Sequence, residues 1–300
     1  MNTIPPADRK LIIPITWAII LLGSSLPDII YHEWTGSIPG WLVWVKLGIL
    51  SVFFILCHFQ KAIRSLWQLV LVLGVFYMAG ILKLAIWDGA WFKNQMATQL
   101  QTFISGQVLW EIFDLAAAAL ILAVVWAIKL QPGKFYLSKG DLHANVEPVR
   151  WLGVKEGTSI RKFGLIFLLV ACAALLFILV PGAKLSGDSL NKVLPFIPTV
   201  LVIAALNSLG EEISFRVSLL STSVELVGRN QAVWLAAVFF GLAHFIGGQP
   251  GGIPGVLVTT FLGWGFGKCM AESKTMLFPW FIHFVMNSII FFFSALGTLL

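Results

Sequence analysis

Apolar runs of close to 20 residues recur along the whole chain. They cover roughly 11–31, 41–59, 66–87, 103–128, 163–180, 196–220, 232–246, 253–270 and 277–300. Because the hydrocarbon core of a bilayer is about 30 Å thick and a helix rises about 1.5 Å per residue, about 20 apolar residues can cross it as a helix. A backbone in lipid must satisfy its own hydrogen bonds. The runs therefore predict an all-α, polytopic membrane bundle of about eight or nine transmembrane helices.

The composition supports this class and excludes others. Of the 300 residues, 58% are hydrophobic and 11% are charged, which is outside the range of soluble globular proteins. The formal net charge of +6 does not indicate nucleic-acid binding, because the basic residues lie in short segments between the apolar runs. Cys57, Cys172 and Cys269 are far apart and lie in or beside apolar runs, so they predict no disulfide framework.

The basic residues also predict how the chain lies in the membrane. If the loops alternate between two sides, the side of the N-terminus holds Arg9, Lys61 and most of the other loop lysines and arginines. The opposite side holds only Lys93, Lys184 and Lys192. By the positive-inside rule, the N-terminus is cytoplasmic and the C-terminus faces outward, in a plasma or other cell membrane.

One hydrophilic segment, 131–162, divides the chain, and it is too short to form a domain. We predict that it is a cytoplasmic linker between an N-terminal four-helix membrane region, 1–130, and a C-terminal membrane region, 163–300. Within the N-terminal region, Glu111 and Asp114 share a helix face at i, i+3 spacing, and Lys83 lies in the preceding run. We expect one of the two acids to form a structural ion pair with Lys83.

The stretch from Asn207 to Leu220 places three charges in an apolar run, where each costs about 2.5 to 3.5 kcal/mol near the bilayer centre. On a helix the neighbours Glu211 and Glu212 point about 100° apart, so we expect that they do not both face one small cavity. Glu212 and Arg216 are at i, i+4 and should form an ion pair. Glu211 is then the carboxylate that remains free to meet other helices.

Two later runs carry further polar residues. His244 lies well inside the seventh run, and His283 and Asn287 lie one turn apart in the last run. Each histidine alone is typical of a hydrogen-bonded core residue. Together with Glu211, a carboxylate, two imidazoles and an amide come from three helices. Such groups can activate water and stabilise an oxyanion, with or without a metal ion.

These residues resemble a known family. Glu-Glu-x-x-x-Arg at 211–216, Phe-x-x-x-His at 240–244 and His-x-x-x-Asn at 283–287 occur in the order found in the CPBP family. These are the CAAX-protease and bacteriocin-processing intramembrane endopeptidases, also called the Abi family. The resemblance covers about 196–293, and the first four apolar runs carry none of its motifs.

The resemblance implies hydrolysis of a peptide bond in or near the membrane, on a membrane-associated peptide or protein. It implies that Glu211 is the base that activates water, supported by Glu212 and Arg216. His244 and His283 would be partners of that water or ligands of a metal, and Asn287 would be an oxyanion donor.

The resemblance leaves the metal open. A metalloprotease would hold a divalent ion such as zinc on Glu211, His244 and His283, which is an acceptable open ligand set. A metal-free glutamate protease would use Glu211 as the base and the histidines with Asn287 as donors. In eukaryotic relatives the substrate is a prenylated CAAX protein, whereas in a bacterium we expect a peptide or small membrane protein.

Two other functions are compatible with buried Glu and His residues. A proton-coupled transporter also uses such residues as a relay, but it should show repeat symmetry between its halves. The polar residues here cluster in one third of the chain instead. An inactive scaffold or immunity protein would keep the motifs only for helix packing.

Overall fold

The computed structural model describes residues 6–96, 103–129, 135–183, 185–247 and 251–299. Within these ranges the chain is helical, and the only β-type pairings are isolated bridges such as that between Leu137 and Thr275. Seven of the helices described are long and apolar enough to cross a membrane, or eight if a bent pair counts as one span. The predicted all-α membrane bundle is therefore confirmed.

The N-terminal region contains six α-helices. They are α1 (Pro6–Leu22), α2 (Leu26–Thr35), α3 (Leu42–Phe59), α4 (Trp67–Trp87), α5 (Ala90–Gln95) and α6 (Phe103–Lys129). The first predicted run, 11–31, is not one straight helix, because α1 and α2 meet at an angle of 48°. At the break the Ser24 hydroxyl accepts the Leu26 N–H at 3.0 Å, and Pro27, which has no amide hydrogen, lies in the first turn of the new helix.

The C-terminal region continues with further helices. They are α7 (Ile160–Leu179), α8 (Gly187–Val193), α9 (Ile197–Glu211), α10 (Ser218–Val227), α11 (Arg229–Gly247), α12 (Gly252–Ser273) and α13 (Leu277–Leu299). The run 253–270 was predicted as a span, but α12 is not among the helices apolar enough to count as one. Its glycines, threonines and Lys268 lower its hydropathy, and its second half is buried in the bundle rather than lipid-facing.

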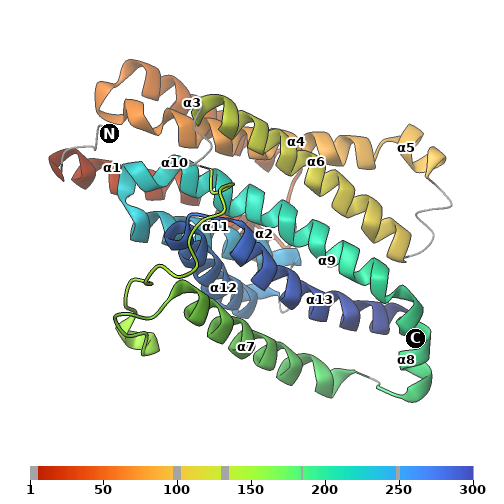
Figure 1. Cartoon of the computed structure of the whole chain (residues 1–300). Coiled ribbons are helices and arrows are strands. Elements are labelled where there is room, and N and C mark those ends of the chain that lie inside the picture. The colour runs from red at the N-terminus through yellow and green to blue at the C-terminus, as the bar shows by residue number, and fades with distance from the viewer. Residues whose placement is uncertain (1–5, 97–102, 130–134, 184, 248–250, 300) are drawn as a thin grey trace.

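The helices form layers around α9 and α10. Figure 1 shows α3, α4 and α6 on one side of these two helices, and α11, α12 and α13 on the other, with α7 along the far face. The N-terminus and the segment between α6 and α7 lie at one end of the bundle, and the C-terminus lies at the opposite end (Figure 1). The direction of the bundle across the membrane stays a prediction.

The predicted linker, 131–162, packs against the bundle where it is described. Its first residues, 131–134, lie outside the described ranges. Phe135 and Tyr136 are buried, and the Tyr136 carbonyl accepts the Met276 N–H at 2.7 Å. Further along, the Glu147 N–H donates to the Glu272 carboxylate at 2.9 Å. The segment is thus fixed to the turn between α12 and α13.

Helices α11 and α12 pack closely at Gly241. A Cβ atom added there would lie 1.9 Å from the Thr260 hydroxyl oxygen and 2.8 Å from the Val256 carbonyl oxygen. Since small residues let membrane helices approach closely, Gly241 brings the helix that carries His244 against α12.

Gly241→Ala is expected to destabilise the protein by roughly 1–3 kcal/mol, because the added methyl overlaps α12. Thermal unfolding in detergent would measure the change. Gly80→Ala in α4 is the matched control, since a Cβ there meets nothing within 4 Å. Equal unfolding temperatures for the two variants would contradict the close packing at Gly241.

Candidate active site

The sixth predicted run contains a π-helical turn, Glu212–Val217, between α9 and α10. A π-helix has i→i+5 hydrogen bonds, so its turn is wider than that of an α-helix, and such turns are frequent at functional sites. The turn begins directly at the pair Glu211 and Glu212. Glu212 and Arg216 therefore lie in the widened turn, and Glu211 lies directly before it.

His283 on α13 contacts both neighbouring glutamates. Its Nδ1 lies 2.9 Å from Glu212 Oε1, and its Nε2 lies 3.4 Å from Glu211 Oε2. The expectation that the two carboxylates do not share one small site is wrong, because one imidazole fits between them and offers a nitrogen to each. They still differ in access, since the Glu212 side chain is 0% exposed and that of Glu211 is 23% exposed.

The predicted pair of Glu212 and Arg216 is present. Arg216 Nη1 lies 3.3 Å from Glu212 Oε1, and both side chains are fully buried. The Arg216 Cζ also lies 3.7 Å from the ring centroid of Phe240 and 5.2 Å from that of Phe266. A guanidinium over ring faces gains cation–π attraction. The cation is thus stabilised by one carboxylate and two rings in the interior of the bundle.

His244 on α11 lies against the same aromatic ring. Its Nδ1 is 2.8 Å from the Phe240 carbonyl oxygen, and its ring centroid is 4.3 Å from that of Phe240. The Phe240 ring centroid is also 6.2 Å from that of His283. Since a carbonyl only accepts, Nδ1 donates this hydrogen bond. Within the described residues, no polar contact joins His244 to Glu211.

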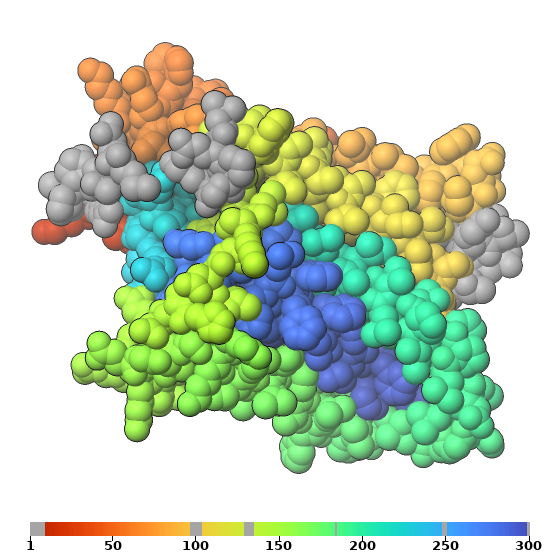
Figure 2. All heavy atoms as spheres, viewed as in Figure 1, coloured from red at the N-terminus to blue at the C-terminus, as the bar shows by residue number. Residues whose placement is uncertain are grey.

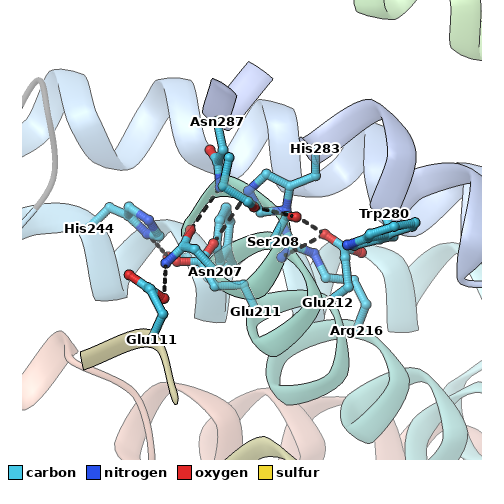
Figure 3. Close-up of polar contacts among 12 residues, drawn as sticks. Glu111, Asn207, Ser208, Glu211, Glu212, Arg216, His244, Trp280, His283 and Asn287 are labelled. Carbon is cyan, nitrogen blue, oxygen red and sulfur yellow. Dashed lines mark hydrogen bonds and ion pairs between the residues drawn. The ribbon is translucent and has the colours of Figure 1, made fainter. Parts of the chain in front are cut away.

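Asn287 joins the site through two further residues. Its Nδ2 donates to Asn207 Oδ1 at 2.7 Å, and Asn207 Nδ2 donates to Glu111 Oε2 at 3.1 Å. Figure 3 shows Asn207 between Asn287 and Glu111, close to Glu211. Glu111 comes from α6, so the N-terminal region, in which no family motif was found, contributes a buried carboxylate to the network.

The two acids of α6 have different partners. The predicted ion pair is confirmed for Asp114, whose Oδ1 lies 2.6 Å from Lys83 Nζ. The other acid, Glu111, is not part of that pair and contacts Asn207 of α9. The sequence indicated only that Lys83 lies in the apolar run before the two acids. Spacing along α6 does not show which distant helix faces the second acid.

The predicted zinc ligands do not form a ready metal site. Glu211 and His283 lie together, whereas His244 contacts Phe240. In the ranges that the structure describes, no three His, Cys, Asp or Glu side chains are grouped so that they could hold a metal ion. The ligand set Glu211, His244 and His283 thus does not fit a metal in this arrangement.

Comparison with known proteins points to one family. Residues 193–289 match the family model described as "Type II CAAX prenyl endopeptidase Rce1-like". No curated protein and no solved structure matches the chain. The match includes all three motifs and confirms the family predicted from them.

Proposed function

We propose that this integral membrane protease of the CAAX type, with an Rce1-like domain at 193–289, hydrolyses a peptide bond with a water molecule activated by Glu211. One observation supports this proposal most directly. The accessible carboxylate of Glu211 lies 3.4 Å from an imidazole whose other nitrogen is held by the fully buried Glu212. A positioned base beside an oriented imidazole has the general form of a hydrolytic site.

The reaction follows from these groups. Glu211 takes a proton from water as the water oxygen forms a bond to the carbonyl carbon of the substrate. The carbonyl oxygen becomes an oxyanion in the tetrahedral intermediate. When the intermediate collapses, the C–N bond breaks and Glu211 returns its proton to the leaving nitrogen. The products are a carboxyl and an amino terminus, and the enzyme regains its starting protonation state.

His283 and Asn287 are proposed to stabilise the oxyanion. Glu212 Oε1 lies 2.9 Å from His283 Nδ1, which fixes the ring and keeps Nε2 on the side of Glu211, where we propose that it donates to the oxyanion. Asn287 lies one turn further along α13 and offers amide hydrogens. Removing a single oxyanion donor from a protease costs about 10²–10³ in kcat. Arg216 supports the arrangement by holding Glu212.

An apolar cavity near the site supports a membrane-associated substrate. It has a volume of about 550 Å³ and is lined by side chains of α7, α8, α9 and α13, among them Leu176, Leu201 and Ile289. Figure 2 shows α13, in blue, at the surface between α7 and α9. Val285 and Ser288 line the cavity close to His283 and Asn287 along α13. An apolar part of a substrate can thus lie beside the bond to be cut.

Purified protein in liposomes would test the proposed function. The probes are a prenylated CAAX peptide and the same peptide without the prenyl group, and mass spectrometry detects the products. Cleavage of either peptide supports the protease, and the ratio of the two rates shows whether the lipid is recognised. Proton flux across the liposomes without any cleavage would favour the transporter instead.

Peptide cleavage is expected to survive treatment with a metal chelator such as 1,10-phenanthroline, because Glu211 acts on water directly in the proposed mechanism. Cleavage rates before and after treatment, followed by removal of the chelator, measure the effect. Loss of activity that added zinc restores would overturn the metal-free mechanism and favour the ligand set Glu211, His244 and His283.

A further inference from the structure

We infer that Glu111 is a positioning residue of this protease, which fixes the orientation of the Asn287 carboxamide through Asn207. The inference rests on the proposed function, since it concerns the donor that faces the oxyanion. It also assigns a role in the reaction to the N-terminal region, which lies outside the matched segment, 193–289.

Glu111 is the acidic end of a chain of hydrogen bonds. Its side chain is buried, with the residue only 1% exposed. Its Oε1 accepts a hydrogen bond from Gln107 Nε2 at 2.6 Å, and its Oε2 accepts one from Asn207 Nδ2 at 3.1 Å. In the described part of the chain, no lysine or arginine lies within ion-pair distance of this carboxylate. Amide hydrogens therefore stabilise the Glu111 carboxylate.

Both Glu111 oxygens accept hydrogen bonds from amide N–H groups, whereas a carboxamide has a donor end and an acceptor end. Glu111 therefore requires the Nδ2 of Asn207, and this turns the Asn207 oxygen toward α13. That oxygen in turn requires the Nδ2 of Asn287, at 2.7 Å. Each carboxamide therefore has one permitted orientation as long as this series of hydrogen bonds ends in an acceptor, the Glu111 side chain.

Without this acceptor the two carboxamides can flip together. The hydrogen bond between Asn287 and Asn207 also forms when the amide oxygen and nitrogen are exchanged at both residues. In Glu111→Gln the new carboxamide keeps its oxygen on Gln107 and turns its nitrogen toward Asn207, so the flipped arrangement is favoured. The Asn287 nitrogen then points away from its present position, and the oxyanion loses a donor in most of the molecules. The orientation affects a contact to the oxyanion, which forms only during the reaction, so we expect a change in kcat and little change in KM.

The first test is Glu111→Gln, which keeps the size of the side chain but removes the acceptor-only group. We expect kcat for the peptide cleaved by the wild type to fall roughly 10- to 100-fold, with KM within about twofold. The loss is smaller than for removal of a donor, which costs about 10²–10³. Asp114→Asn, on the same helix and paired with Lys83, is the matched control and should keep the wild-type kcat.

A double variant separates positioning from simple packing. In Glu111→Gln with Asn207→Asp, the glutamine donates to the new aspartate, and the aspartate accepts from Asn287. The acceptor is restored one step nearer α13, so kcat should recover to within about threefold of the wild type. Asn207→Asp alone puts two carboxylates side by side and should be impaired, so the pair of changes is strongly non-additive.

Two results would overturn the inference while leaving the proposed function intact. One is a wild-type kcat for Glu111→Gln, and the other is a double variant no more active than Glu111→Gln. The thermal unfolding temperature of each variant checks that it is folded. Failure of the proposed function has a different signature, because Glu211→Gln would then cleave as fast as the wild type.

Discussion

Glu211→Gln is expected to lower kcat for peptide cleavage by about 10²–10⁴-fold, the usual contribution of general acid–base catalysis. The carboxamide has nearly the same shape as the carboxylate but cannot take a proton from water. The Glu211 side chain is 23% exposed, and its ion-pair contact is with His283 Nε2 at 3.4 Å. The change should therefore leave the packing intact. Binding of the uncleaved peptide and the unfolding temperature should therefore stay near the wild-type values.

The matched control for this change is Glu33→Gln in α2, where the glutamate side chain is 62% exposed and far along the chain from the site. It should cleave at the wild-type rate. Comparison of membrane peptides from cells with wild-type protein and with Glu211→Gln would then reveal natural substrates as peptides that accumulate. A Glu211→Gln protein that is folded and fully active would refute the assigned base.

Arg216→Ala is expected to destabilise the protein by about 3–5 kcal/mol, the usual cost of removing one partner from a buried ion pair. Both Arg216 and Glu212 are 0% exposed, so the remaining carboxylate has no access to water. The guanidinium also fills the space between the rings of Phe240 and Phe266. Unfolding in detergent with increasing denaturant measures the loss.

Two further variants show whether charge or volume causes the loss. Lys93→Ala removes one partner of an exposed pair with Asp88, 3.0 Å apart, and should cost no more than about 1 kcal/mol. Glu212→Gln with Arg216→Met removes both charges and should recover most of the stability. It should stay inactive, because a carboxamide at position 212 no longer holds the His283 ring as the carboxylate does. A stable Arg216→Ala protein would contradict a structural role for the pair.

Several features could be predicted from the sequence because they depend on residues close along the chain. The apolar runs indicate helices by length alone. The pair of Glu212 and Arg216 follows from one helical turn, and the motif residues at 211–216, 240–244 and 283–287 indicated the family. The break after Leu22 was missed, although Ser24 and Pro27 are typical of a helix boundary.

The contacts between helices could not be predicted in the same way. His283 lies between Glu211 and Glu212 because a π-helical turn and the position of α13 bring one imidazole to two neighbouring residues. A periodic α-helix places these residues about 100° apart, and that angle alone does not show that an imidazole from another helix reaches both.

The sequence by itself thus determined a helical membrane protein, the similarity of residues 193–289 to the CAAX-type endopeptidases, and the polar residues of its C-terminal helices. Only the tertiary structure decided that Glu111, 96 positions before Asn207, is hydrogen-bonded to it, and that His244 contacts Phe240. The physical reason is that helix periodicity fixes which residues share a face, whereas the neighbour of that face depends on how distant helices pack.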